Sequence, residues 1–352
     1  PAGFVWRARD PQKSIYTGEG QTDVFVMQDH GPVYVQERHG ERRHGTMQDV
    51  INFYKLGQTS RVNAIVGQCT VDPHEVDGPN KHQLLRHTDK PIMSWPVATI
   101  GENEKVFKMI EMVMGEGYLA SHYFVTASVC ALSPLQYAQE SADTIIAYAR
   151  ANQPVTVLTA PMTGVSTPIS DIGALVAQNA ELLAGIVLAQ LVQPGVPVIY
   201  GTATYAADMR SGAFITGSPL SNLIDRAALQ LAQSLYHMPT RTLAGNTDAK
   251  VPDIQAGYET MQNYIQLLMG GTHMINECLG ILDGMMTVSY EKYIIDEEML
   301  RRVGCMMRGL DTSEASFDMG VLLETPHMEP FLMHESTLAA CSGQWQPDVA
   351  CW

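Results

Sequence analysis

The sequence lacks the spacings of cysteine and histidine that bind structural metals. Its six cysteines form no CxxC pair and no Cys/His ligand spacing; they stand at Cys69, Cys130, Cys278, Cys305, Cys341 and Cys351. Scattered cysteines of this kind are typical of free thiols in a reducing compartment. The HExxH motif is also absent, so we expect no tightly bound metal of the protein's own.

Positive charge is scarce as well. The chain has 22 lysines and arginines against 37 acidic residues, a formal net charge of −15. This balance argues against nucleic acid as a partner, because phosphate binding needs clustered basic side chains. No stretch reaches the roughly 18 uninterrupted apolar residues of a membrane helix, and the first residues lack a signal-peptide core. We therefore expect no membrane partner and a cytoplasmic location.

What the chain does have is a regular alternation of short apolar runs with helical patterns. The runs expected as strands span residues 64–66, 92–95, 119–126, 155–159, 198–201, 241–244 and 272–275. The helical patterns that follow them span 103–114, 134–151, 171–191, 219–237, 253–269 and 290–307. This rhythm predicts an α/β fold, a (β/α)8 TIM barrel. A doubly wound open sheet is the alternative, but no GxGxxG follows an early strand.

The N-terminal part has a different pattern. Residues 23–27 and 32–36 flank Gln28-Asp29-His30-Gly31, which indicates a β-hairpin, and Thr46 is placed to cap a following helix. We therefore predict one domain over 1–352, with an N-terminal β/α extension (1–60), a barrel body (61–310) and a C-terminal segment (311–352). The chain begins at Pro1 without Met and ends at Trp352 without an obvious final helix, so we expect it to be truncated at both termini.

Polar and aromatic residues follow three successive strands, at Tyr200 to Asp208, Gly245 to Lys250 and Asn276 to Cys278. Because parallel strands end on one side of a sheet, these residues should share one cavity. Four aromatic residues at expected strand ends could surround a quaternary ammonium ion: Tyr200, Tyr205, Tyr123 and Trp95. His273 could bind a carboxylate, so a zwitterionic betaine would satisfy both halves of such a site.

Plainer readings of these residues remain open. Each aromatic residue alone is more often a packing residue than part of a binding site. His273 and Glu277 have the HxxxE spacing of half a metal site, without a third ligand at helical spacing. Lys250 could bind an anion, act as an amine nucleophile, or be a solvated loop residue.

Three longer segments resemble the trimethylamine methyltransferase family, in its non-pyrrolysine branch that demethylates glycine betaine and related quaternary amines. They are Pro197 to Gly201 with Asp208 to Ala213, then Thr247 to Glu259, and His273 to Asp283 followed by Ser289-Tyr290-Glu291. The resemblance implies a TIM barrel whose mouth receives a separate corrinoid protein. It also implies transfer of a methyl group from glycine betaine or a close analogue to Co(I) of that corrinoid.

The resemblance and the residues together give expected roles. We expect His273, and secondarily Lys250, to bind the substrate carboxylate, and the four aromatic residues to bind the ammonium group. The cofactor-facing residues are expected to be Asp208, Asn246, Asp248 and Gln255. No acid or base is assigned, because catalysis by positioning is sufficient for a quaternary amine. We also expect a homo-oligomer.

Three alternative functions stay open. The chain could act on trimethylamine or another methylamine, or bind a betaine without catalysis on the same fold. It could also be a lysine-dependent barrel lyase that forms a Schiff base at Lys250.

Overall fold

The computed structural model describes residues 2–28, 31–37, 41–67, 79–94 and 99–350. In these residues, eight strands form one sheet in the order β3-β14-β13-β10-β9-β8-β7-β6, and each neighbouring pair is parallel. The strands are β3 (Phe25–Val26), β6 (Ile65–Val66), β7 (Ile92–Ser94), β8 (Val125–Ala131), β9 (Val155–Thr159), β10 (Val198–Thr202), β13 (Thr240–Leu243) and β14 (Met274–Asn276).

The first and last strands of this sheet meet, so the sheet closes into a barrel. Met27, directly after β3, forms a parallel bridge with Ala64, directly before β6. The Asn63 backbone N–H donates to the Val26 carbonyl at 2.7 Å, and the Asn63 side chain accepts from the Val26 N–H at 2.8 Å. The predicted TIM barrel is confirmed.

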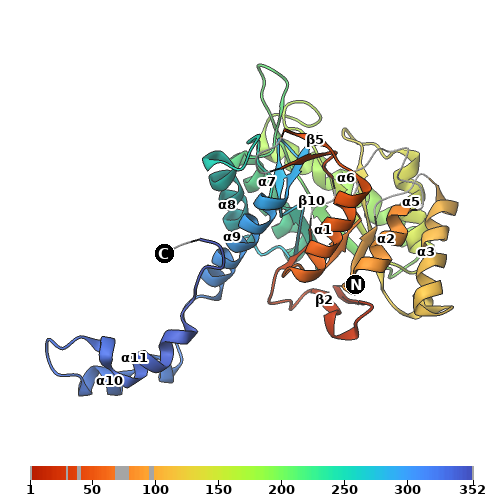
Figure 1. The fold of residues 1–352 in the computed structure, drawn as a ribbon. Helices are drawn as coiled ribbons and strands as arrows, with labels where there is room; N and C mark the ends of the chain where they lie inside the picture. The colour runs from red at the N-terminus through yellow and green to blue at the C-terminus, as the bar shows by residue number, and fades with distance from the viewer. Residues whose placement is uncertain (1, 29–30, 38–40, 68–78, 95–98, 351–352) are drawn as a thin grey trace. The chain divides into compact units, whose positions relative to one another are not determined.

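Helices surround the strands (Figure 1) and follow them along the chain. They are α1 (Met47–Thr59), α2 (Pro79–His87), α3 (Ile100–Met114), α4 (Tyr118–Ser121), α5 (Gln139–Arg150), α6 (Asp171–Val192), α7 (Pro219–Ser234), α8 (Ile254–Leu268) and α9 (Tyr290–Arg308). Thr46 caps α1 as predicted: its hydroxyl accepts from the Asp49 N–H, and the Asp49 carboxylate accepts from the Thr46 N–H.

The amino end of the barrel is closed by a hairpin of β1 (Gly3–Trp6) and β2 (Ile15–Gly18). Phe4 and Trp6 are buried against the side chains that fill the lower barrel, among them Met27, Met93 and Met274. The Trp6 indole N–H donates to the Phe124 carbonyl at 3.1 Å. This end of the barrel is a packed core, so a ligand site must lie at the carboxyl end.

The predicted hairpin of residues 23–27 and 32–36 is wrong. β3 is the first barrel strand and pairs in parallel with β14, whereas β4 (Tyr34–Gln36) pairs with β16 (Thr287–Ser289) and β5 (Arg43–His44). Short apolar runs indicate strands but not their partners, and residues 29–30 lie outside the described part. The predicted strand at 119–126 is also displaced: residues 118–121 form α4, and β8 continues to Ala131 through the small polar residues Ser128 and Cys130.

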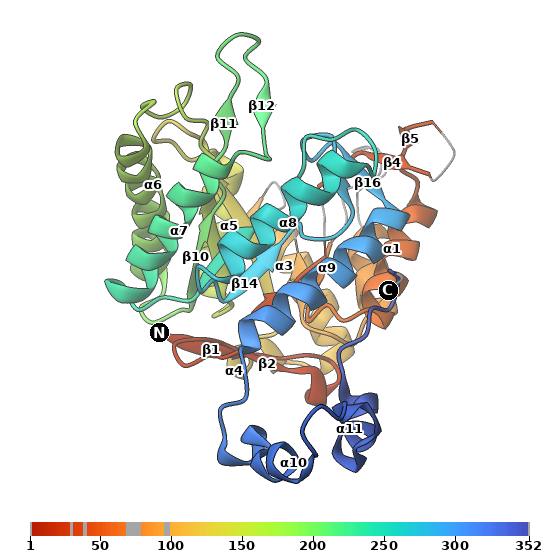
Figure 2. The same cartoon turned by 90° about the vertical axis from the view of Figure 1, so that its left-hand side faces the viewer.

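Two excursions extend from the barrel's carboxyl end. One is a hairpin of β11 (Ala206–Ala207) and β12 (Phe214–Ile215), which projects above the barrel in Figure 2. The other is a small sheet in the order β15-β16-β4-β5, with β15 at Ile281–Leu282. Both come from loops that follow barrel strands, and such loops form the active sites of TIM barrels.

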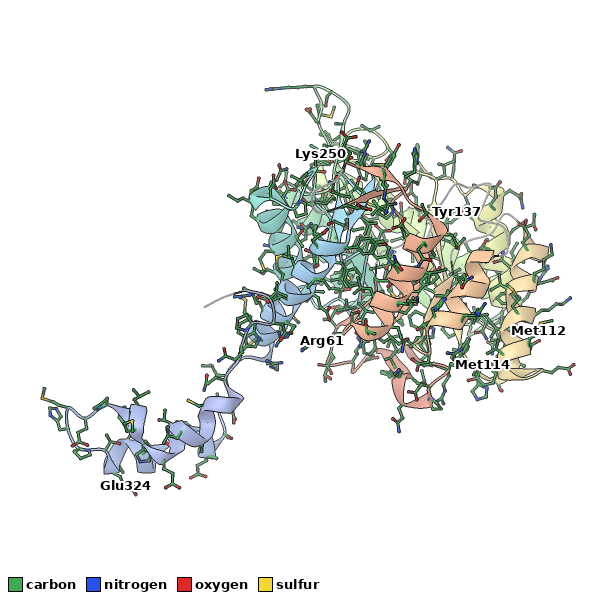
Figure 3. The ribbon with its side chains drawn as sticks, in the orientation of Figure 1. Arg61, Met112, Met114, Tyr137, Lys250 and Glu324 are labelled. Carbon is green, nitrogen blue, oxygen red and sulfur yellow. The ribbon has the colours of Figure 1, made fainter. Side chains whose placement is uncertain are left out.

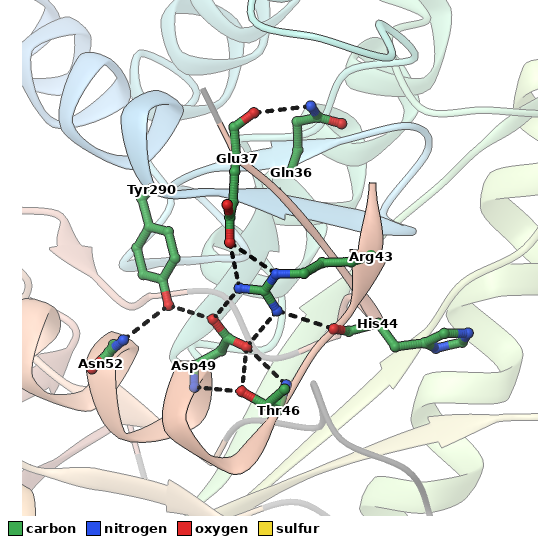
Figure 4. A network of polar contacts seen from close by, with 8 residues as sticks. All are labelled: Gln36, Glu37, Arg43, His44, Thr46, Asp49, Asn52 and Tyr290. Carbon is green, nitrogen blue, oxygen red and sulfur yellow. Dashed lines mark hydrogen bonds and ion pairs between the residues drawn. The ribbon is translucent and has the colours of Figure 1, made fainter. Parts of the chain in front are cut away.

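The small sheet is fastened to α1 by a network of charged and polar side chains (Figure 4). The Arg43 guanidinium donates to both carboxylate oxygens of Asp49, at 2.8 and 2.9 Å. Asp49 also accepts from the Tyr290 hydroxyl at 2.8 Å and from Thr46. Burial raises the pKa of Asp49, but the hydrogen bonds from Arg43, Thr46 and Tyr290 outweigh it and hold the pKa well below its usual range.

The chain divides into two compact units, residues 1–297 and 298–352. The barrel belongs to the first unit. The second contains the end of α9 and short helices at Glu314–Phe317, Met319–Glu324, Phe331–Met333, Glu335–Ala340 and Cys341–Gly343. The domain limits expected near residues 60 and 310 stay predictions.

Candidate active site

The upper part of the barrel contains a cavity of about 360 Å³. It is lined by residues on or after five neighbouring strands, together with β12: Ser128, Cys130, Leu158, Ala160, Ala203, Tyr205, Phe214, Arg241, Leu243, Glu277 and Met285, with Ser141. The ends of β10, β13 and β14 thus share one cavity, as the sequence predicts. The volume lies within the usual range for small-molecule sites, about 300–1,000 Å³.

Two charged residues, Arg241 and Glu277, line the cavity, and Arg241 lies within strand β13. Its side chain extends from β13 and is only 1% exposed, and its Nε and Nη1 have no hydrogen-bond partner among the described residues. Burial lowers the pKa of Arg241, and the nearby carboxylate of Glu277 opposes that change. A guanidinium remains charged in proteins, so this buried cation is available to an anionic ligand.

Glu277 holds a strained position at the end of β14. Its φ is +49°, a left-handed conformation that is uncommon for residues other than glycine. Its carbonyl accepts from the Gly245 N–H at 3.1 Å, so the loops after β13 and β14 touch at this point. A Cβ on Gly245 would lie less than 3.0 Å from the Cys278 backbone, closer than real Cβ atoms approach. The close approach of these loops therefore requires glycine at 245 and fixes Glu277 on the same cavity as Arg241.

Another part of the wall is aromatic and apolar. The rings of Tyr205 and Phe214 lie 4.2 Å apart between centroids, and the Tyr205 hydroxyl donates to the Met285 Sδ at 3.2 Å. Tyr205 also packs with Ala203 and Leu243. Burial, together with the charges of Glu277 and Asp225, raises the pKa of Tyr205 well above its usual value, so its phenol stays neutral. Such a wall suits a methylated cation.

Cys130 opens into the cavity but is not a competing nucleophile. Although the residue is exposed to the cavity, desolvation by the surrounding protein raises the pKa of its thiol to about 11. It is therefore protonated at neutral pH, and only the thiolate is strongly nucleophilic.

A second cavity of about 820 Å³ adjoins the first at the barrel mouth. Phe214 and Met285 line both cavities. The wider cavity is otherwise lined by Gly31, Asp208, Ala213, Ile215, Asp248, Lys250, Asp283, Gly284 and Met286. We call it the vestibule, because it lies between the β11–β12 hairpin and the loops after β13 and β14.

Three residues predicted for the site line the vestibule. Lys250, labelled near the top of the barrel in Figure 3, forms an ion pair with Asp283 and leaves 75% of its side chain exposed. Asp208 lies in the hairpin loop, where it accepts from the Ser211 hydroxyl at 2.5 Å. Asp248 accepts from the backbone N–H groups of Thr216 and Gly217, at 2.9 and 3.0 Å, and so anchors the chain after β12.

Two further predicted residues line neither cavity. Asn246 is buried, and its carbonyl accepts from the Asn263 side chain at 2.9 Å. Gln255 on α8 donates to Glu259 at 2.9 Å, and Glu259 in turn accepts from the Asp248 N–H at 2.9 Å. Gln255 therefore supports the loop after β13 from outside the barrel.

The predicted placement of His273 and Tyr123 at the carboxyl ends of their strands is wrong. His273 precedes β14, where its Nδ1 accepts from the Thr240 N–H at 3.0 Å, and burial lowers its pKa. Tyr123 precedes β8 and packs edge-on against Phe4 of the hairpin that closes the barrel, with ring centroids 5.7 Å apart. Both residues lie at the amino end. His273 and Glu277 stand at opposite ends of β14 and do not form half a metal site.

The predicted place of Tyr200 in the cavity is wrong as well. Ile199 packs in the barrel core, so its neighbour Tyr200 points outward to the helices. Its hydroxyl donates to the Asn179 side chain on α6 at 3.0 Å. Trp95 lies outside the described residues. In the described residues no group of three His, Cys, Asp or Glu side chains could hold a metal ion.

The sequence reasoning did not assign Arg241, Phe214 or Met285 to the site. An arginine inside a barrel strand was the available signal, because such a residue is rarely buried without a function or a partner. Phe214 and Met285 reach the cavity from excursions that strand patterns do not reveal.

The whole chain, residues 1–352, matches the family described as trimethylamine methyltransferase (MTTB). The chain belongs to this family, which makes it an enzyme of the methyltransferase class, and the predicted resemblance is confirmed. Glycine betaine methyltransferase of Desulfitobacterium hafniense (strain Y51) is 34% identical over 325 residues, 90% of this chain and 67% of that protein. Proline betaine:corrinoid methyltransferase of Eubacterium limosum is 34% identical over 297 residues, 81% of this chain and 61% of that protein.

The other comparisons agree. Trimethylamine methyltransferase MttB of Desulfitobacterium hafniense (strain DSM 10664 / DCB-2) is 29% identical over 353 residues, 98% of this chain and 70% of that protein. Among solved structures, monomethylamine methyltransferase (MtmB) of Methanosarcina barkeri matches with a TM-score of 0.58 at 11% identity, over 96% of this chain and 73% of that one. This last similarity concerns the fold alone.

Proposed function

We propose that the chain demethylates a quaternary amine that carries a carboxylate, glycine betaine or a close analogue. The observation that carries this proposal is the buried Arg241, which lines the cavity and whose Nε and Nη1 have no hydrogen-bond partner among the described residues. A guanidinium in that setting binds a carboxylate through two parallel hydrogen bonds. Relatives named for glycine betaine and proline betaine act on compounds of this chemical class.

The charges of the cavity are complementary to a zwitterion. Arg241 and Glu277 place one positive and one negative side chain in the same wall. A betaine carries one charge of each sign, so its carboxylate is directed to Arg241 and its ammonium group away from it. In this proposal Arg241 takes the role expected of His273.

Tyr205, Phe214 and Met285 form the surface for the methylated ammonium group. Ring faces attract a cation without forming a bond to it, and the neutral Tyr205 phenol adds no charge of its own. The interaction is moderate in strength. That matters because the nitrogen loses its positive charge during methyl transfer, and a stronger cation cage would stabilise the ground state over the transition state.

The methyl acceptor is proposed to be a corrinoid carried by a separate protein, whose Co(I) supplies the electron pair that bonds to the methyl carbon while the C–N pair remains on the amine. The vestibule suits the binding of a corrinoid protein, because it is wide and adjoins the inner cavity at the barrel mouth. Asp208, Asp248 and Lys250 line it and are proposed to face the cofactor. The chain's own residues then hold one methyl group toward the mouth and exclude water from it.

Binding measurements on Arg241→Met and Arg241→Lys test this proposal by isothermal titration calorimetry. Loss of charged hydrogen bonds worth about 1.5–3 kcal/mol raises the dissociation constant for glycine betaine by about 10- to 150-fold in Arg241→Met. Binding of choline, which has the ammonium group but no carboxylate, changes little. Arg226→Met is the matched control, because Arg226 is exposed on α7 and bonds only to Gln266 in the described contacts. Equal losses for both ligands, or none, would refute the role of Arg241.

Methyl transfer to free Co(I) cobalamin, followed by absorbance, separates the alternatives. Turnover of betaines but not of trimethylamine supports the proposal. Turnover of trimethylamine with unchanged rate in Arg241→Met would favour a methylamine substrate. Tight betaine binding without any transfer would favour a non-catalytic binding protein.

A further inference from the structure

Helix α6 has an apolar outer face. Of its residues that are exposed, all but Asp171 at the first position are apolar: Ile172, Val176, Ala180, Ala184, Val187 and Leu191. Their spacing of three or four residues places them in one stripe along the helix. The four larger side chains are 54–77% exposed. A surface helix normally presents polar residues to water, so this face is unusual for a free surface.

No charged side chain interrupts the stripe. The only charged residues of α6 are Asp171 and Glu181, and Glu181 is buried, where it accepts from the Ser133 hydroxyl at 2.7 Å and the Leu135 N–H at 2.8 Å. Neighbouring elements add exposed apolar residues, at Leu135, Ile169, Leu220 and Leu223. Figure 2 shows α6 at the outer edge of the barrel beside α7. An apolar surface of this kind marks a contact with another protein or with a membrane.

The sizes of the stripe residues form a palindrome. Along the chain they read large, large, small, small, large, large, centred near residue 182. In an antiparallel pair of α6 helices about a two-fold axis, Ile172 faces Leu191, Val176 faces Val187, and Ala180 faces Ala184. A two-fold interface requires this self-complementarity, because each residue pair occurs twice. The central alanines let the two helix backbones approach closely.

We propose that the outer face of α6 binds the same face of a second copy of this chain. The helix is about 33 Å long at 1.5 Å per residue. With its apolar neighbours it offers a surface suited to an interface of about 800 Å² per partner. The two-fold contact leaves the barrel mouth open, since the stripe runs along the side of the barrel.

A lipid surface is the other possible occupant, because α6 has the length and composition of a membrane span. Its place in the barrel disfavours that role. Gln178 and Glu181 are buried and bonded to residues of neighbouring strands and loops. Helices that lie on membranes also carry basic residues beside the apolar face, and α6 has none.

Charge pairs across the proposed contact provide a test by sedimentation velocity. Val176→Asp and Val187→Lys each place an unpaired charge in the interface, and each raises the dissociation constant by about 100-fold or more and halves the particle mass. An equimolar mixture of the two variants restores the mass, since the carboxylate introduced at position 176 of one copy then faces the ammonium group introduced at position 187 of the other. Val113→Asp, a substitution at a 49% exposed valine on α3, leaves the wild-type mass unchanged.

A second mixture tests the antiparallel register of the two α6 helices. A mixture of Val176→Asp with Ile172→Lys does not restore the mass, because positions 172 and 176 lie at opposite ends of the contact in an antiparallel pair. Circular dichroism and thermal unfolding confirm that each variant is folded. A wild-type monomer, a mass unaffected by Val176→Asp, or rescue by the mismatched mixture overturns the proposal. So does flotation of the wild-type protein, but not of Val176→Asp, with vesicles of phosphatidylcholine and phosphatidylglycerol.

Discussion

The rings of Tyr205 and Phe214 lie 4.2 Å apart, although Tyr205 follows barrel strand β10 and Phe214 belongs to the projecting β11–β12 hairpin. The hairpin thus contributes an aromatic face to a cavity that otherwise belongs to the barrel. This contact makes the hairpin part of the proposed binding site.

Replacement of Phe214 by alanine tests the aromatic wall. A cation–π contact of about 0.5–2 kcal/mol corresponds to a roughly 2- to 30-fold increase in the dissociation constant for glycine betaine. The isostere 3,3-dimethylbutanoate should lose less affinity, because it keeps the shape and the carboxylate but has an uncharged tert-butyl group in place of the ammonium group. Calorimetry with both ligands measures the difference. Phe317→Ala, at a 61% exposed phenylalanine of the second unit, is the control. Equal losses for both ligands would mean that Phe214 contributes shape alone.

Gly245→Ala should damage the site through the backbone. The added Cβ collides with the Cys278 backbone, so the loops after β13 and β14 must separate, at a cost of about 1–3 kcal/mol in the free energy of unfolding. Urea unfolding measures that cost, and betaine affinity should fall with it because Glu277 moves.

Gly257→Ala is the matched control for this substitution. Gly257 lies within α8 and has nothing within 4 Å of an added Cβ. Alanine there should stabilise the protein by up to about 1 kcal/mol through its higher helix propensity. If Gly245→Ala were as harmless as Gly257→Ala, the loop contact would not need glycine.

Asp49→Asn should lower the free energy of unfolding by an amount that depends on pH. The folded-state pKa of Asp49 is depressed, so the carboxylate contributes stability that is fully present above the unfolded pKa of about 4 and is lost as pH falls through the folded pKa. The difference in unfolding free energy between wild type and Asp49→Asn should therefore be largest near pH 7 and shrink below about pH 4. Urea titrations at several pH values measure it, with Asp23→Asn, at an exposed aspartate, as the control. A difference that grows toward low pH would contradict the network.

Lys250→Ala distinguishes the methyltransferase hypothesis from the Schiff-base lyase hypothesis. Lys250 is largely exposed and paired with Asp283 at the vestibule, outside the inner cavity. Surface ion pairs contribute about 0–1 kcal/mol, so betaine affinity should change by no more than about 5-fold. Borohydride treatment with a carbonyl compound should leave the mass of the protein unchanged. A reduced adduct at Lys250 would instead support a lyase.

The sequence predicts the repeating units well and the orientation of single side chains poorly. Residues 155–159 are the predicted and the observed strand, and α6 differs from its prediction by one residue. Apolar runs with clear polar flanks define such elements. The runs do not mark which side chains face the lumen, because strands buried on both faces are apolar at every position. Tyr200 was misplaced for that reason.

The errors at His273 and Tyr123 have a related cause. Each lies within two residues of a strand, and a boundary error of that size transfers a side chain from the mouth of the barrel to its closed end. Arg241 and Glu277 come from different strands, and their convergence depends on how the sheet closes. No local pattern contains that information, so the shared place of the two charges on one cavity emerges only from the three-dimensional fold.

Phe4 and Trp6 of the first hairpin close the amino end of the barrel, so the cavity opens only at the carboxyl end among the described residues. If a partner protein occupies that opening during the reaction, the demethylated amine has no rear exit and must wait for the partner to leave. Turnover would then follow a compulsory order in which the small molecule enters first and departs last.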